Sequence, residues 1–300
     1  MAKQIITVLC EGPHDVAFIC RILKSIGYKS NESIKIGEYP KPFDALLTRE
    51  ATKTDVEQLN LTELRRNLLP SNVLLRGETH VFLYSLGGDG KVQIRQRILT
   101  ELRSLVVEDG EIIADRNNDA VLSLVYLFDA DQLGVAGRLA QINNEIKSAL
   151  PSEVTTDLFA NNGTHAKVSK MKLGAFIFTD DGNITGKLED ILVPLMKIDN
   201  EPSFDAAAAY LVQHHDDARL YPLKLTIEGT AITEARSVRQ GDKEKFDQKK
   251  SLIGTVGQLQ RSGKSNVVCI SDSDYLSLEK LANNHKCVEI ASFFESFTNV

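Results

Sequence analysis

The chain has 300 residues, 42% hydrophobic and 25% charged, which is enough for one large domain or a core with a smaller appendage. No window has the composition of collagen, a coiled coil or a disordered tract, so we expect a globular protein. The formal net charge of −6 argues against a protein that coats nucleic acid through bulk electrostatics.

The N-terminus and the cysteines bear on the compartment. The apolar run Ile5 to Leu9 is too short for the core of a signal peptide, and no stretch approaches membrane-spanning length. None of the four cysteines forms a CxxC pair, which is typical of buried reduced thiols in a reducing compartment. We therefore predict a cytoplasmic protein without a membrane segment.

The chain opens with a strand and a helix. Residues 4–10 are a β-branched apolar run, which predicts a buried strand ending at Glu11. Gly12 and Pro13 suit the start of a helix that should end at Gly27. Residues 28–75 are less regular, and we interpret them as an excursion from the main sheet.

The middle of the chain alternates strands with amphipathic helices, the pattern of βαβ units and a parallel sheet. The predicted strands cover residues 80–86, 120–128 and 173–178. The predicted helices cover residues 91–107, 132–149, 187–197 and 203–215. The fold class predicted from this pattern is α/β, with a parallel sheet flanked by helices.

The last hundred residues should add a further α/β extension, packed on the same core as residues 1–200. We expect a helix over 243–260, a strand over 266–271, a helix over 275–283 and a short strand near 287–291. An acidic segment, 176–217, precedes a basic one, 219–264. This pattern fits either a metal site beside a phosphate-binding surface or two solvated faces.

Three acids stand where predicted core strands end: Glu11 after the first strand, and Asp129 and Asp131 after the strand 120–128. Ligands of open parallel sheets bind beyond the carboxyl ends of the strands. In an extended segment, residues i and i+2 point to one side, so the two aspartates can face the same ion. Carboxylate oxygens suit Mg²⁺. Asp131 could instead cap a helix, and for Asp15 we favour a helix-dipole role.

The motifs around these acids resemble those of Toprim domains. Glu11-Gly12-Pro13-His14-Asp15 is similar to the EGxxD signature, and Asp129-Ala130-Asp131 is similar to the DxD signature. The resemblance implies a Toprim-like Rossmannoid sheet. Because Glu11 and Asp129 are further apart than in compact Toprim domains, residues of about 28–75 would be an insertion. His14, His80, His165 and His285 are isolated and show no metal-ligand spacing, and for His214 and His215 we favour a surface helix end over a metal site.

Residues 186–192, with the sequence GKLEDIL, are similar to a GxLED segment of Toprim-like prokaryotic proteins. By analogy with overcoming-lysogenization-defect nucleases, Glu189 and Asp190 would support a second metal ion. Lys250 would be the lysine that assists catalysis. Gly87 and Gly88, after the strand 80–86, could cradle a phosphate or form a plain tight turn.

The resemblance implies phosphoryl transfer with Mg²⁺ or Mn²⁺. No primase zinc motif and no tyrosine in a strand-cleavage context is present, so we expect a nuclease, in phage defence or DNA metabolism, with nucleic acid as its partner. The family also implies an alternative: a non-catalytic subunit of an ATPase. A homo-oligomer is compatible with either.

A second enzyme class competes. Haloacid-dehalogenase phosphatases use a DxD after a strand, a strand ending in Thr or Ser, a lysine, and a strand ending in paired acids. Here Asp129 and Asp131, Thr179, Lys250, and Asp272 with Asp274 follow that order. That pattern leaves Glu11 unexplained.

Overall fold

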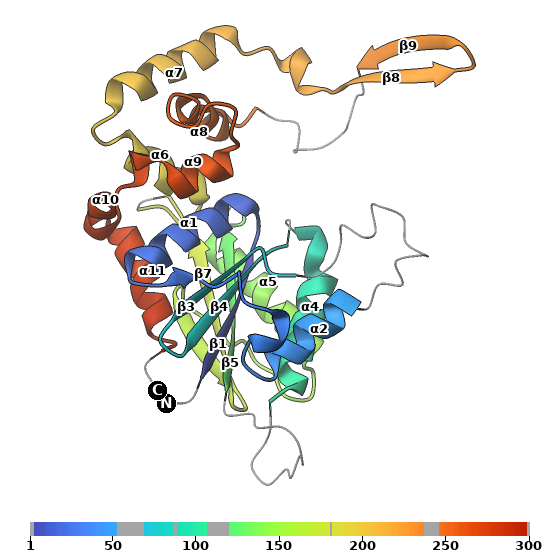
Figure 1. The fold of residues 1–300 in the computed structure, drawn as a ribbon, viewed down its shortest axis with the longest axis vertical. Helices are drawn as coiled ribbons and strands as arrows, with labels where there is room; N and C mark the ends of the chain where they lie inside the picture. The colour runs from blue at the N-terminus through green and yellow to red at the C-terminus, as the bar shows by residue number, and fades with distance from the viewer. Residues whose placement is uncertain are drawn as a thin grey trace.

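The computed structural model describes residues 3–52, 69–86, 89–106, 120–180, 182–236 and 246–298. A seven-stranded sheet lies between two layers of helices (Figure 1). Its order is β2-β3-β4-β1-β5-β7-β6. The four parallel strands are β1 (Gln4–Cys10), β4 (Thr79–Ser85), β5 (Val121–Asp129) and β7 (Met171–Phe178). This arrangement confirms the predicted α/β class.

Antiparallel strands extend the sheet at both edges. On one side, β3 (Asn72–Arg76) pairs with β4 and β2 (Lys29–Ser30) pairs with β3. On the other side, β6 (Thr164–Val168) pairs with β7. The predicted excursion over 28–75 is therefore wrong at its two ends, because β2 and β3 belong to the sheet; residues 53–68 lie outside the described part.

The central strands are apolar on both faces because helices cover both sides of the sheet. Every residue of β1 is buried. Ile6 and Val8 face the first layer: α1 (Pro13–Ser25), α6 (Leu188–Lys197) and α11 (His285–Glu295). Ile5 and Leu9 face the second layer: α2 (Phe43–Thr52), α4 (Val92–Ser104) and α5 (Gly134–Ala149).

The chain changes direction across the sheet between β1 and β5. From β1 it passes to β4 on one side, and from β4 it crosses to β5 on the other. The connections that leave β1 and β5 therefore run to opposite sides, and the carboxyl ends of these two strands flank a topological switch point. Open α/β sheets bind their ligands at such points. Glu11 directly follows β1, and Asp129 is the last residue of β5.

The C-terminal part is mainly helical and shares the core of the sheet. Ile253, Ile270 and Ile290 lie in the same buried cluster as Val8 of β1. The elements not yet placed are α7 (Glu201–His214), β8 (Leu223–Glu228), β9 (Ala231–Arg236), α8 (Gln248–Gly257), α9 (Asn266–Asp272) and α10 (Leu278–Asn283). Four short 3-10 helices complete the described elements: Ile36–Glu38, Asp89–Lys91, Asp217–Leu220 and Asp274–Leu276.

Two predicted C-terminal strands are wrong. Residues 266–271 form α9, because this β-branched run has no strand to pair with and instead packs its buried Cys269 and Ile270 on helices. Arg21 of α1 donates to the carbonyl oxygens of Ser271 and Ser273 at the end of α9. Residues 287–291 lie in α11, whose buried positions recur at helical spacing.

The other predicted helices and strands of the core are confirmed to within three residues at their ends, except that the helix predicted over 243–260 is the shorter α8 in the described residues. In the described ranges, no helix has both the length and the apolarity needed to cross a membrane.

Candidate active site at the switch point of the sheet

Glu11 and Asp129 meet at the carboxyl ends of β1 and β5. The backbone N–H of Asp129 donates to Oε2 of Glu11 over 3.1 Å. The two residues are 118 positions apart in sequence, and parallel pairing of β1 with β5 brings them together. The predicted convergence of these two acids is therefore present in the structure.

Asp131 reaches the site by another route than the one predicted. Its backbone has a φ of 47°, so the segment is not extended and the i, i+2 argument does not apply. Its N–H donates to the carbonyl oxygen of Gly186, which joins the DxD segment to the GKLEDIL segment. The Asp131 side chain is 49% exposed and caps no helix. This left-handed turn orients it toward a basic side chain, Arg138.

Arg138 of α5 contacts all three acids predicted to bind the metal, Glu11, Asp129 and Asp131. Its Nη2 lies 2.8 Å from Oδ2 of Asp131 and 3.6 Å from Oε1 of Glu11. Its Nε donates to the carbonyl oxygen of Asp129 over 2.8 Å. The side chain is only 3% exposed. The guanidinium of Arg138 therefore occupies the space between Glu11 and Asp131. The sequence analysis missed this arginine.

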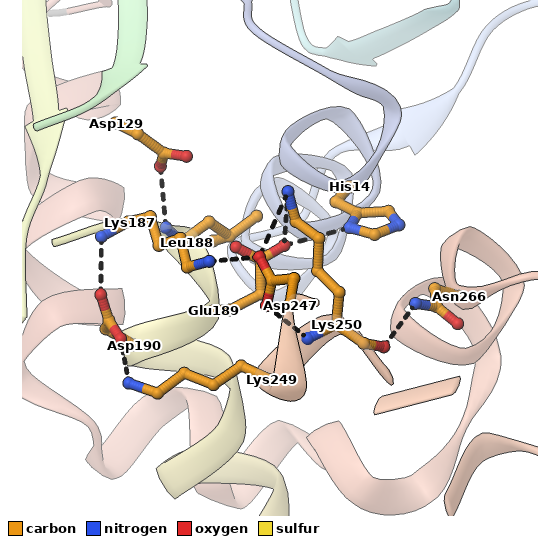
Figure 2. Close-up of polar contacts among 10 residues, drawn as sticks. All are labelled: His14, Asp129, Lys187, Leu188, Glu189, Asp190, Asp247, Lys249, Lys250 and Asn266. Carbon is orange, nitrogen blue, oxygen red and sulfur yellow. Dashed lines mark hydrogen bonds and ion pairs between the residues drawn. The ribbon is translucent and has the colours of Figure 1, made fainter. Parts of the chain in front are cut away.

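Glu189 enters the site from the first turn of α6, and only 2% of its side chain is exposed (Figure 2). His14 Nδ1 lies 3.2 Å from its Oε1, and Lys250 Nζ lies 3.6 Å from the same oxygen. Its other oxygen, Oε2, is buried and has no hydrogen-bond partner among the described residues. A buried carboxylate oxygen without a partner is costly, so this atom marks a place for a ligand.

The carboxylates of Glu11, Asp15, Asp129 and Glu189 form what we call the acidic cluster. Burial, followed by the charges of Asp15 and Glu11, raises the pKa of Asp129 well above its ordinary value. Burial also raises the pKa of Asp15, and the charges of Glu11 and Glu189 add to the effect. The four acids are thus close enough to repel one another in a buried region.

Two of these acids also stabilise helix N-termini. Oδ1 of Asp129 accepts from the N–H of Leu188, the first residue of α6, over 2.7 Å. Oδ2 of Asp15 accepts from the N–H of Gly12, the N-cap of α1, over 2.6 Å, which is the half of a capping box that the N3 residue supplies. The predicted structural role of Asp15 is present, and its side chain belongs to the cluster as well.

Asp190 differs from Glu189, its neighbour in sequence. Its Oδ2 accepts from the N–H of Lys187, the N-cap of α6, over 2.7 Å. Its Oδ1 pairs with Nζ of Lys249. Both oxygens are engaged, as Figure 2 shows: one accepts at the N-terminus of α6, and the other joins α6 to α8. Asp190 therefore has a structural role in the structure, and its part in a second metal site stays a prediction.

The predicted lysine, Lys250, lies at the start of α8. Its N–H donates to Oδ1 of Asp247, the N-cap of this helix, and its carbonyl oxygen accepts from Asn266. Lys187 also pairs with Asp247, so α6 and α8 are tied at this point. These contacts hold the backbone of Lys250 while its side chain stays 47% exposed beside Glu189.

Gly186 shows why the GKLEDIL segment begins with glycine. Its φ is 125°, and a Cβ at this position would lie 2.2 Å from the backbone nitrogen of Asp180. The chain therefore passes close to the end of β7 before α6 begins. Gly87 and Gly88, the predicted phosphate-binding pair, lie outside the described residues.

A divalent cation such as Mg²⁺ needs oxygen ligands directed toward one point. As the side chains stand, no three His, Cys, Asp or Glu residues in the described ranges form a group that could hold a metal ion. The Arg138 guanidinium lies between Glu11 and Asp131, which accounts for the separation of those two acids. The chemistry of the acidic cluster nevertheless fits Mg²⁺ or Mn²⁺, because it offers hard oxygens, excess negative charge and the unpartnered Oε2 of Glu189.

The pattern of a haloacid-dehalogenase phosphatase is not met. That pattern needs a strand that ends in paired acids, whereas Asp272 ends helix α9 and Asp274 begins a 3-10 helix. These two acids are exposed rather than at the carboxyl edge of the sheet. The described residues therefore do not support the phosphatase hypothesis.

The fold and the site together define an α/β protein with a doubly wound sheet and an acidic cluster at its switch point. The chain belongs to the family described as protein of unknown function (DUF3226), whose model matches residues 6–299. Comparisons with curated proteins and with solved structures gave no match.

Proposed function

We propose that this protein is a Toprim-like, metal-dependent enzyme that hydrolyses phosphodiester bonds of nucleic acids. The observation that carries the proposal is that the partly buried Glu11 and Asp129 lie together with the buried Glu189 at the switch point, with one oxygen of Glu189 left without a partner. Like charges buried at this density are retained at a cost in stability, which is typical of active sites.

The residues that would hold the metal are Glu11, Asp129 and Glu189, with Asp131 at the exposed side. When bound, Mg²⁺ or Mn²⁺ supplies Lewis acidity toward a phosphate oxygen and lowers the pKa of a water molecule. The basic partners of the cluster, Arg138 and Lys250, then compete with the cation for the same carboxylates. The proposal requires that Arg138 shift away from Glu11 or Asp131 when the cation enters.

Lys250 is the residue placed to contact substrate. Its ammonium group is beside Glu189 and half exposed, so a phosphate that approaches from solvent meets it next to the acids. A positive charge at that place stabilises the charge that develops on the transferred phosphate. The backbone hydrogen bond from Lys250 to Asp247 fixes the start of α8, so the position of the lysine is set before substrate binds.

The net charge of −6 means that binding to nucleic acid would depend on a local basic surface. Lys187, Lys249 and Lys250 all lie where α6 meets α8 (Figure 2). Lys187 and Lys249 are paired with Asp247 and Asp190, so Lys250 is the member of this group best placed to contact a polyanionic substrate.

The test is cleavage of labelled single- and double-stranded DNA and RNA with Mg²⁺, with Mn²⁺ and with a chelator. We expect cleavage that requires the metal and that Glu11→Gln abolishes, because this change removes one negative ligand while keeping the side-chain shape. Glu279→Gln, at an exposed residue of α10, is the matched control and should retain full activity. Metal-independent cleavage, or cleavage that survives Glu11→Gln, would contradict the proposal.

One observation favours a second function, that of a non-catalytic subunit of an ATPase. The guanidinium of Arg138 already neutralises Glu11 and Asp131, so it can replace a cation in a degenerate site. In that case the wild-type protein should cleave no nucleic acid with either metal and should co-purify with an ATPase. Cleavage that depends on Glu11 would rule this function out.

A further inference from the structure

The hairpin of β8 and β9 projects from the body of the molecule, as Figure 1 shows. Every residue of both strands is exposed. A two-stranded hairpin alone is marginally stable in water, so an exposed one needs further contacts. Its largest exposed apolar side chains, all on one face, are those of Leu223, Leu225, Ile227 and Ile232.

The opposite face of the hairpin carries an unusual arrangement of charge. Lys224 of β8 lies opposite Ala235 of β9, and Glu228 lies opposite Ala231. Neither charged side chain has an ion-pair partner in the part of the chain that the structure describes. The same strand therefore presents one cation and one anion, four residues apart, with only small residues beside them.

The free edge of β8 can pair with another strand. The two-residue turn of Gly229 and Thr230 joins Glu228 to Ala231, which makes these two a hydrogen-bonded pair. Hydrogen-bonded pairs alternate along the ladder, so Leu225 and Ile227 direct their backbone N–H and C=O groups away from β9. An exposed row of such groups is a template for a further strand.

We propose that this edge binds a second copy of the same chain, with the two β8 strands antiparallel about a twofold axis. When Thr226 lies opposite its own copy, Lys224 faces Glu228 of the second copy, and Glu228 faces the second copy's Lys224. On the other face, Leu225 lies opposite Ile227 of the second copy. The strand is therefore complementary to itself in charge and in apolar contact, as a twofold interface requires.

This pairing gives a four-stranded sheet from two hairpins, which is large enough to be stable where each hairpin alone is not. Lys224 and Glu228 would form non-hydrogen-bonded pairs, in which side chains are closest, with Cα atoms about 4.5 Å apart. The proposal does not depend on the function of the acidic cluster, because the hairpin is a separate element of the chain.

Sedimentation velocity across a range of protein concentrations tests the proposal. The wild-type protein should be dimeric, and Lys224→Glu and Glu228→Lys should each raise the dimer Kd at least about tenfold, because each single reversal sets like charges opposite each other. An equimolar mixture of these two variants should form a heterodimer, since every pair is then complementary. Lys264→Glu, an exposed reversal elsewhere, should remain dimeric.

Within a single chain, both residues face alanines, so these reversals should leave the circular dichroism and the thermal unfolding of the body unchanged. A monomeric wild-type protein overturns the proposal, including the case in which the hairpin binds a different protein. A dimer that resists both reversals places the interface elsewhere. Two monomeric variants that fail to combine show that the proposed register is wrong.

Discussion

Two groups of buried charge adjoin neighbouring residues of β5, and they are balanced very differently. The guanidinium of Arg95 lies 5.0 Å from the ring centroid of Phe128 and binds Glu145 through Nε and Nη2, at 3.0 and 2.7 Å. Asp129, the residue after Phe128, belongs to the acidic cluster. One anion meets one cation in the first group, whereas several anions repel one another in the second.

The difference shows that buried charge is not by itself a sign of function. The Arg95–Glu145 pair is bidentate and joins α4 to α5; burial raises the pKa of Glu145, and the hydrogen bonds and charge of Arg95 act against that shift. In the acidic cluster, the pKa of Asp129 is raised by burial and by its acidic neighbours, and an oxygen of Glu189 has no partner. An excess of like charge beside a buried oxygen without a partner is the feature that points to a ligand.

The largest effect is expected from breaking the compensated pair. Arg95→Ala leaves Glu145 buried without its cation, and we expect the free energy of unfolding to fall by about 3–5 kcal/mol. Urea unfolding measures it. The double variant Arg95→Met with Glu145→Leu should recover most of the loss, because no buried charge remains. A single variant as stable as the wild type would show that this pair is not a structural element.

The second prediction compares substitutions of two adjacent lysines, Lys249 and Lys250. Lys250→Ala should reduce the rate of nucleic-acid cleavage on the order of 10²- to 10³-fold, because it removes the positive charge beside Glu189. Lys249→Ala removes only the pair with Asp190 and should retain most activity. Single-turnover rates of the two variants measure the difference. Equal losses in both would mean that the lysines act through the folding of α8 rather than on substrate.

The smallest predicted effect is an increase in the free energy of unfolding rather than a loss of stability or activity. Asp129→Asn keeps an oxygen that can accept from Leu188 and removes a carboxyl group whose ionisation burial and the neighbouring acids oppose, so in chelator it should raise the free energy of unfolding by ~1 kcal/mol. Urea unfolding beside wild type measures it. Asp157→Asn, at an exposed residue paired with Lys147, is the control and should not stabilise the fold. A loss of stability in Asp129→Asn would contradict the view that the cluster is strained by its charge.

The parallel core could be predicted from the sequence because its strands are uniformly apolar and end abruptly. Those endings also placed Glu11 and Asp129 at one edge, since parallel strands share the direction of their carboxyl ends. Glu189 came only from the resemblance of its segment to Toprim-like proteins. Asp131 was found for the wrong reason, because its left-handed backbone could not be deduced from alternation.

Arg138 and His14 were missed because their roles depend on contacts between distant elements. A signal existed for Arg138: it lies in the apolar stripe of α5, between Val135 and Ile142, where an unpaired arginine would be costly. His14 is three residues after Glu11, within the motif itself. The helix α9 was predicted as a strand because a short β-branched run does not distinguish the two without knowledge of its packing.

The central claim is that the acidic cluster binds a divalent cation, and the most direct measurement is Mn²⁺ binding followed by electron paramagnetic resonance. We expect saturable binding that Mg²⁺ displaces, that Glu11→Gln and Asp129→Asn abolish, and that Glu279→Gln retains. Absence of binding to the wild-type protein, or binding that survives both cluster substitutions, would contradict the claim.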